Sequence, residues 1–238
     1  MFDATSLKQR IIVTQSTVEC PVMGCNHHVN RQRTHFQALE EFKCPTHGIY
    51  ISPSTFEYSN RTDNLLWKNK QDTERLNQIC TVKRESNRMT RDNSEDAVTW
   101  NVFRYLEKYS LKLLLSEISG YTVEDPEIIY WSHCQSQKAA WSELQRARLE
   151  FETTPEKGSE PDLIVKAKNA LFFIEAKVNA SNETTPSSNS PKVEKRYTKG
   201  GNNWYSKVLN ASFQEIAVSA KKYELLRFWL LGSWIANN

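Results

Sequence analysis

The sequence lacks both a long apolar run and the N-terminal features of a signal peptide. No stretch approaches the roughly 18 apolar residues that a membrane-spanning helix needs. The longest candidate, FWLLGSWIA, is too short and is typical of a core strand. The first residues show no basic region followed by an apolar segment, so a signal peptide is not expected. These absences predict a cytoplasmic protein without a membrane partner.

A strong net charge and internal repeats are also absent. The net charge is only +3 over 238 residues, so the chain as a whole is not a polybasic binder. The charge is uneven, however: residues 61–91 carry eight Lys or Arg against four acids, and residues 192–207 carry five against one. Such stretches suit contact with nucleic-acid phosphates, and ordinary solvated surface explains each of them equally well.

The five cysteines are an odd number, which argues against a disulfide framework in a cytoplasmic chain. Three of them lie in CPVMGC and CPTHG near the start. Cys20, Cys25, Cys44 and His47 form the pattern C-x4-C followed, after 18 residues, by C-x2-H. Structural zinc takes four such ligands in tetrahedral geometry. We predict that these four residues bind Zn²⁺ in a zinc-ribbon or treble-clef-like module over residues 1–60.

The predicted zinc is structural, because four protein ligands leave no open position for water. A small module with little core gains its stability from the metal. His27 and His28 are alternative ligands beside the first cysteine pair. Whether the module reads DNA or docks a partner is left open by the sequence.

The stretch GSEPDLIVKAKNALFFIEAKV, residues 158–178, holds two apolar runs that end in charged residues. Both runs are short enough for strands, and the KN between them favours a two-residue turn, although the preferred glycine is missing. If Lys168 and Asn169 form that turn, Asp162 lies directly opposite Glu175. Lys177, two residues further on, then shares their face.

Two facing carboxylates repel each other unless positive charge lies between them. Mg²⁺ meets this need, since proteins hold it with one or two carboxylates, waters and phosphate oxygens. The alternative is a salt-bridged strand end, in which Lys177 neutralises one of the carboxylates.

Pro161-Asp162, the hairpin and Glu175-Ala176-Lys177 together resemble the signature of the PD-(D/E)XK nuclease superfamily. That signature also asks for an upstream acid on a helix. NSEDAVTWNVFRYLEKYS supplies Glu95 in the first turn after a Ser94 N-cap. The resemblance covers residues 92–235.

The residues around Glu95 favour it over Asp96 as the upstream acid. Glu95 lies on a helical stripe with Val98, Val102, Leu106 and Tyr109, which predicts that it faces the core. Asp96 is rotated away from that stripe.

The resemblance implies an α/β fold with a restriction-endonuclease-like αβββαβ core. Residues 61–90 would form a linker or helix between the zinc module and a nuclease domain over 91–238. The expected elements of that domain are helices at 94–117, 136–151 and 212–226, strands at 127–131 and 227–233, the hairpin, and a polar loop at 179–192. The chain stops as another helix begins, so we expect a fragment or a domain of a longer protein.

The resemblance also implies a metal-dependent nuclease that hydrolyses phosphodiester bonds, with DNA as the expected substrate. Asp162 and Glu175 would hold one or two Mg²⁺ or Mn²⁺ ions with the Ala176 carbonyl, and Glu95 would add a ligand. Lys177 would orient the attacking water and neutralise developing charge.

Further candidates and alternatives remain open. Gln214 is a further candidate for contact with this site, and Tyr197 and Lys199 for contact with phosphate. One alternative is a catalytically silent nuclease-fold module that binds nucleic acid or protein. Another is a zinc-organised interaction protein with a chance motif. A partner subunit or a homodimer is compatible with each of these functions.

Overall fold

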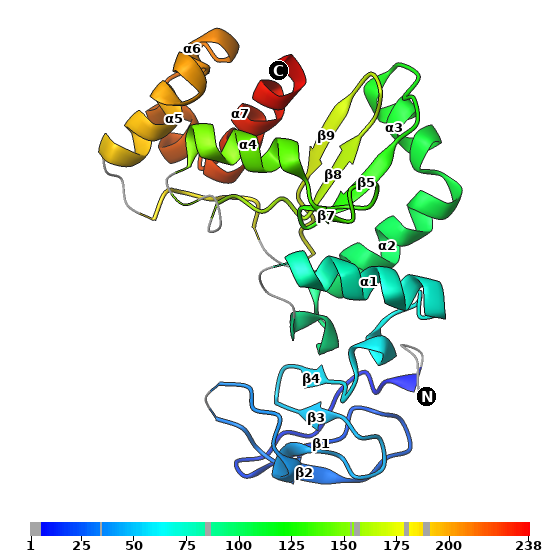
Figure 1. Cartoon of the computed structure of the whole chain (residues 1–238). Helices are drawn as coiled ribbons and strands as arrows, with labels where there is room; N and C mark the ends of the chain where they lie inside the picture. Colours follow the sequence, from blue (N-terminus) through cyan, green and yellow to red (C-terminus); the bar gives the residue numbers. More distant parts are fainter. Residues whose placement is uncertain are drawn as a thin grey trace. The chain divides into compact units, whose positions relative to one another are not determined.

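The structure is a computed structural model that describes residues 6–33, 35–83, 87–152, 154, 158–178, 181–187 and 191–238 (Figure 1). The chain divides into two compact units. The first comprises Met1–Thr73 and Glu85–Asn101, and the second comprises Glu74–Arg84 and Val102–Asn238. Each unit is described by itself below. The predicted domain ranges of 1–60, 61–90 and 91–238 stay a prediction.

The first unit is built on two small antiparallel sheets. One pairs β1 (Thr17–Glu19) with β2 (His28–Asn30), and the other pairs β3 (Tyr50–Ile51) with β4 (Phe56–Glu57). Short 3₁₀ turns complete the unit: η2 (Glu40–Phe42), η3 (Arg61–Asn64) and η4 (Asn87–Thr90). One apolar cluster of this unit has nine buried residues among those that the structure describes, and three of these are cysteines. So small a cluster predicts that this part of the unit needs a further source of stability.

The second unit contains a five-stranded sheet in which all neighbouring strands are antiparallel. The strand order is β7 (Ala139–Ala140), β6 (His133–Cys134), β5 (Glu127–Tyr130), β8 (Leu163–Lys166) and β9 (Leu171–Ile174). The three longer strands β5, β8 and β9 are adjacent, and β9 forms one edge of the sheet. Ile128, Ile129 and the apolar residues of β8 are fully buried, which explains why these strands read as continuous apolar runs.

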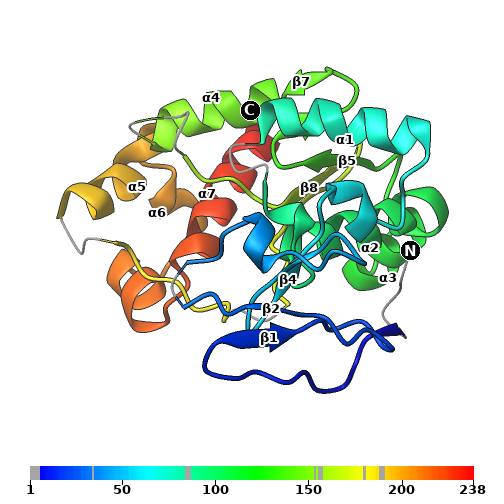
Figure 2. The same ribbon diagram turned by 90° about the horizontal axis from the view of Figure 1, so that it is seen from below.

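Helices supply the other half of the second unit's core. Two helices have their first residues in the first unit and their remaining residues in the second: α1 (Lys70–Val82) and α2 (Glu95–Tyr109). The remaining helical segments are α3 (Leu111–Ser119), α4 (Ser142–Phe151), α5 (Pro191–Asn203), α6 (Tyr205–Val208), the π-helix η6 (Gln214–Ser219) and α7 (Tyr223–Asn237). Buried side chains of α4, α6 and α7 meet those of β5 and β8 in one core cluster. In Figures 1 and 2, β5 and β8 lie between α4 and α3.

Several expected elements are confirmed. The strand expected at 127–131 is β5, and the hairpin expected at 162–175 is the β8–β9 pair. The helix expected at 94–117 is formed by α2 and α3, which are separated at Ser110. Gly120 ends α3 in the left-handed conformation with φ of 75°, as expected of a helix-ending glycine. The mixed α/β class is therefore confirmed.

Three expected elements are wrong in part or in full. The helix expected at 136–151 begins only at Ser142, because residues before it turn back to form β7. The helix expected at 212–226 is divided between η6 and α7. The strand expected at 227–233 lies inside α7, and the described residues add no parallel strand to the five-stranded sheet. A short apolar run does not distinguish a buried strand from a buried helix, so the sequence pattern was ambiguous here.

The polar loop expected at 179–192 falls partly outside the described residues. Its described part includes Thr184, which forms an isolated bridge with Lys222, and its last residues already belong to α5. Among the described residues, no helix is both long enough and apolar enough to cross a membrane.

Substitution of Gly201 tests how tightly the second unit is packed. The residue has a φ of +55°, and an added Cβ would lie 2.7 Å from Phe151 Cζ and 2.9 Å from Trp234 Cδ1. Gly201→Ala should therefore lower the free energy of unfolding by about 2–4 kcal/mol, through crowding and an unfavourable backbone conformation. Gly120→Ala is the matched control, since its φ is +75° with nothing within 4 Å. We expect the control to cost about 1 kcal/mol in urea unfolding, and equal losses would contradict the packing described here.

Candidate metal centres

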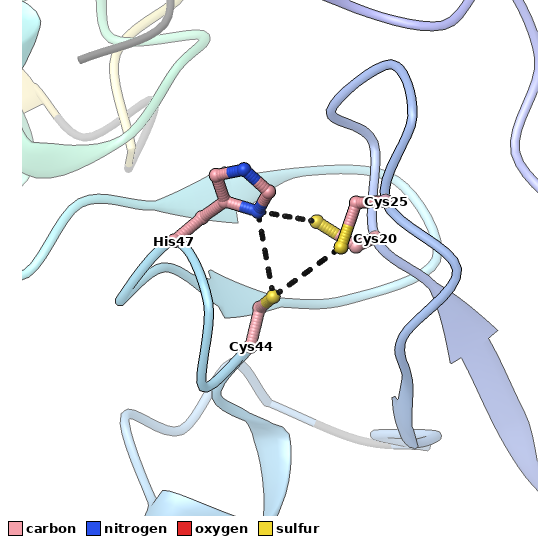
Figure 3. Close-up of side chains that lie close together, drawn as sticks. All are labelled: Cys20, Cys25, Cys44 and His47. Carbon is pink, nitrogen blue, oxygen red and sulfur yellow. Dashed lines mark hydrogen bonds between the residues drawn. The ribbon is translucent and has the colours of Figure 1, made fainter.

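The first candidate centre gathers Cys20, Cys25, Cys44 and His47 in the first unit (Figure 3). Cys20 follows β1 directly, and Cys25 closes a tight turn in which its N–H donates to the Val22 carbonyl over 3.1 Å. Cys44 and His47 belong to a second turn, in which Gly48 N–H donates to the Cys44 carbonyl over 2.8 Å. Two chain turns therefore present two ligands each, as the spacing predicted.

The positive φ values of two glycines allow these turns. Gly24 has φ of 75° just before Cys25, and Gly48 has φ of 66° just after His47. A left-handed backbone is unfavourable for residues with a Cβ, so glycine suits both positions. The geometry of the two turns is thus encoded next to the ligands themselves.

The distances within the cluster fit a tetrahedral zinc ion. His47 Nδ1 lies 3.6 Å from the Sγ atoms of both Cys20 and Cys44, and the Sγ atoms of Cys25 and Cys44 are 3.8 Å apart. All four donor atoms lie within 4.8 Å of one another. Tetrahedral zinc with ordinary bond lengths would separate two sulfurs by about 3.8 Å and sulfur from nitrogen by about 3.6 Å. The donor set therefore could hold a structural metal such as zinc.

Burial makes a metal-free cluster costly to ionise. All three cysteines are buried, and burial raises the pKa of the Cys20 thiol, with the neighbouring Cys44 and Cys25 thiols raising it further. A divalent cation replaces those thiol protons and removes the repulsion between the sulfurs. His27 and His28 stay outside this cluster on exposed positions, and His28 Nδ1 lies 3.1 Å from the Asn26 carbonyl.

The second candidate centre lies at the end of the β8–β9 hairpin in the second unit. Ala167 N–H donates to the Ala170 carbonyl over 2.8 Å, which confirms the two-residue turn at Lys168 and Asn169. The strand pairs Leu163–Ile174 and Lys166–Leu171 continue the predicted register. One step beyond the paired strands, this register sets Asp162 opposite Glu175. The Ala176 N–H donates to Asp162 Oδ2 over 2.9 Å, so the Asp162 carboxylate reaches across to the other strand.

Glu175 has a buried carboxylate oxygen that no hydrogen bond satisfies among the described residues. Its side chain is only 8% exposed, and its Oε1 accepts a hydrogen bond from Lys177 Nζ. Its other oxygen, Oε2, is buried and has no hydrogen-bond partner among the described residues. Burial raises the pKa of Glu175 to about 7, and the nearby charges of Asp162 and Glu224 add to this, although the bond from Lys177 opposes it. A buried carboxylate oxygen without a partner requires either a proton or a cation.

Lys177 is held by acids from two elements. Besides Glu175, it lies 3.8 Å from Glu224 Oε2 on the first turn of α7. Burial lowers the pKa of Lys177, but the bond to Glu175 and the negative charges of Glu175, Glu224 and Asp162 outweigh it and raise the pKa. The side chain therefore stays an ammonium ion at neutral pH. It can donate hydrogen bonds and positive charge, but it cannot act as a general base.

A buried ionic network holds the chain just before Asp162. Arg148 Nε donates to the Ser159 carbonyl over 2.9 Å, and Ser159 N–H donates to the Glu152 carboxylate over 2.9 Å. Arg227 of α7 pairs with Glu152 at 3.0 Å. The N–H and the carbonyl of Ser159, three positions before Asp162, are thus fixed by Arg148 of α4 and by Glu152, which directly follows α4. Such a network keeps a site in one geometry, because removing any one partner leaves a buried charge.

Glu95 is placed only in part as the sequence predicted. Ser94 caps α2, with the Ala97 N–H donating to Ser94 Oγ over 3.1 Å, and Glu95 is the first residue of the helix. The stripe assigned to the core is wrong, since Val98 and Val102 are 40% and 46% exposed. The buried face carries Ala97, Trp100 and Arg104 instead. Glu95 belongs to the first unit, so its assistance to the hairpin site remains a prediction.

The other candidates give mixed outcomes. Tyr197 is buried and its hydroxyl lies 3.4 Å from Glu152 Oε1, so contact with phosphate is not its role. Gln214 lies in η6 and donates to Glu194 over 3.0 Å. Lys199 lies on α5, and its contact with phosphate stays a prediction. The sequence analysis did not identify Glu224. The only signal at this position was an acidic residue near the end of the helix expected at 212–226.

Comparison of the chain with family models, with curated proteins and with solved structures finds no significant match.

The zinc ligands can be tested by metal analysis. The purified chain should contain about one zinc per molecule, because the four donors satisfy one tetrahedral ion. Cys44→Ser should lose this zinc and much of the folded structure of the first unit. His28→Ala is the matched control and should retain zinc, since its ring lies outside the cluster. Zinc lost from the control but kept in Cys44→Ser would refute the assignment.

The raised pKa of Glu175 predicts a pH-dependent stability in the absence of divalent cations. A carboxyl group with a folded-state pKa raised from 4.5 to about 7 stabilises the fold most below pH 4.5. That stabilisation is lost as the pH rises through about 7. Glu175→Gln stays neutral, so it should raise the melting temperature by a few degrees at pH 8 and by little at pH 5. Glu117→Gln, an exposed acid on α3, is the control, and a pH-independent effect of Glu175→Gln would contradict the prediction.

Proposed function

We propose that this chain is a metal-dependent nuclease that hydrolyses phosphodiester bonds, with DNA as its expected substrate. The observation that carries the proposal is the buried, unpartnered Oε2 of Glu175 opposite Asp162, with the ammonium of Lys177 beside them. The order α2, β5, β8 and β9 agrees with the first four elements of the αβββαβ core that the PD-(D/E)XK resemblance implies. The last strand of that core has no counterpart among the described residues.

The donor set fits a hard divalent cation. Asp162 and Glu175 offer carboxylate oxygens at one end of the hairpin, and the Ala176 carbonyl is the predicted third ligand. Oxygen ligands of this kind suit Mg²⁺ or Mn²⁺ rather than zinc, which prefers the thiolates of the first unit. Bound there, the cation would neutralise charge on the scissile phosphate and lower the pKa of a bound water.

The chain's own residues then have separate roles in the proposal. Lys177 keeps its proton, so it orients the attacking water and offsets charge that develops on the phosphate. Glu224 and Glu175 fix the direction of the Lys177 side chain. The Ala176 N–H orients the Asp162 carboxylate. Arg148 and Glu152 act as positioning residues, because they hold the backbone of Ser159 upstream of Asp162.

Cleavage of supercoiled plasmid in Mg²⁺ or Mn²⁺ tests the proposal. Asp162→Ala should abolish both cleavage and the binding of Mg²⁺ measured by calorimetry, while the folded state is retained. Lys177→Ala should keep metal binding and lose about 10²–10³-fold in rate, because its contribution is to charge in the transition state. Glu150→Ala, an exposed acid on α4, is the matched control and should cleave like the parent.

Two outcomes would overturn the proposal. Undiminished cleavage by Asp162→Ala would place the activity at another site. Binding of DNA without cleavage by the parent chain in either cation would identify the silent binding module instead. Glu95→Ala should reduce the rate, and an unchanged rate would remove Glu95 from the site without affecting the roles of the other residues.

A further inference from the structure

The first unit contains a cleft of about 730 Å³ that is separate from both metal centres. Arg31, Arg33 and Arg91 line it, together with Phe36. Its remaining lining residues are serine, threonine, glutamine and proline, and no aspartate or glutamate is among them. A concave surface with three guanidinium groups, only one of which pairs with an acid among the described residues, favours an anionic ligand.

The arginines on one side of this cleft are held without being neutralised. Arg31 Nη1 donates to the Thr14 carbonyl over 2.8 Å, and Arg33 Nη2 donates to the Gln15 carbonyl over 3.0 Å. Neither arginine pairs with a carboxylate in the part of the chain that the structure describes. A guanidinium has five N–H donors, so a single bond to a neutral carbonyl leaves its charge and most of its donors for a ligand.

Gln32 anchors the backbone between the two arginines. Its side chain is buried, and its amide donates to the Ile51 carbonyl over 3.0 Å and accepts from the Gln37 N–H over 2.6 Å. Arg31 and Arg33 on either side of it are exposed. Both arginines, two positions apart in the chain, line the same cleft.

Arg91 and Phe36 form the other part of the cleft. The Arg91 guanidinium lies 5.0 Å from the centre of the Phe36 ring, and its Nε lies 3.3 Å from Glu57 Oε2. Arg91 is thus partly neutralised, and its main contribution is to hold the half-buried aromatic ring in place. A fixed aromatic ring beside unneutralised arginines suits a ligand that has both a flat base and a phosphate.

We infer that this arginine cleft, lined by Arg31, Arg33, Arg91 and Phe36, binds single-stranded nucleic acid. Arg31 and Arg33 contact successive phosphates, and an unstacked base packs against Phe36. An unstacked base of a single strand can reach the Phe36 ring, whereas the bases of a duplex are stacked and closed to an aromatic side chain. An acidic peptide would use the arginines but would leave the ring without a function. The binding is independent of cleavage, so it holds whether or not the proposed nuclease activity does.

Binding is measured on the full zinc-containing chain with Glu175→Gln in the background, so that cleavage does not interfere. The probe is a fluorescein-labelled single-stranded DNA of about ten nucleotides, followed by anisotropy over a range of salt concentrations. Arg31→Gln with Arg33→Gln should weaken binding at least tenfold and reduce the salt slope by about 1.4, the amount expected for two phosphates. Phe36→Leu should weaken binding at least fivefold with the slope unchanged.

Arg33→Gln and Arg10→Gln form the charge-matched pair. Both remove one exposed arginine from the first unit, but Arg10 does not line the cleft. Zinc content confirms that each variant is folded. Only Arg33→Gln should weaken binding, and equal losses would overturn the inference in favour of general charge attraction. Equal competition by a polyglutamate peptide, or equal affinity for the matching duplex, would also overturn it.

Discussion

The register of β8 against β9 determines where the charged groups of the hairpin itself, Asp162, Glu175 and Lys177, lie. The register is set by the turn at Lys168 and Asn169, and this turn is anchored to the segment that leads into β5. Asn169 Oδ1 accepts from the Glu124 N–H over 3.0 Å, and its amide donates to the Thr122 carbonyl over 2.8 Å. A shift by one residue would send Asp162 and Glu175 to opposite faces of the sheet. One asparagine far from the acids therefore supports the geometry of the whole site.

The charges at this site do not cancel in the absence of a cation. Two acids from the hairpin and Glu224 from α7 surround one ammonium group, so the cluster without a cation has more negative than positive charge. Burial raises the pKa of Glu175, and the negative charges of Asp162 and Glu224 raise it further. In the proposed nuclease, a divalent cation supplies the missing positive charge.

Local patterns in the sequence predicted well, and tertiary relations did not. The hairpin and the two cysteine turns depend on a few neighbouring residues, and their geometry agrees with the spacing of Asp162, Glu175 and the zinc-ligand candidates. The strand predicted at 227–233 is wrong, because the apolar residues of this segment suit a buried helix as well as a strand. The prediction that Val98 and Val102 face the core is wrong, because helical spacing identifies a stripe of residues but not what covers that stripe. Glu224 could not be identified from the sequence, because only the packing of α7 brings it to Lys177.

The core of the first unit has a consequence for how its surface can evolve. Three of the nine buried residues in the apolar cluster around the candidate zinc site are its cysteines, so a bound metal would supply much of the cohesion there. Stability that depends on four ligands places few demands on the remaining positions. Exposed loops such as the one that carries Arg31 and Arg33 can then exchange residues with little cost to folding. A module of this kind can change what it recognises quickly, while its scaffold stays the same.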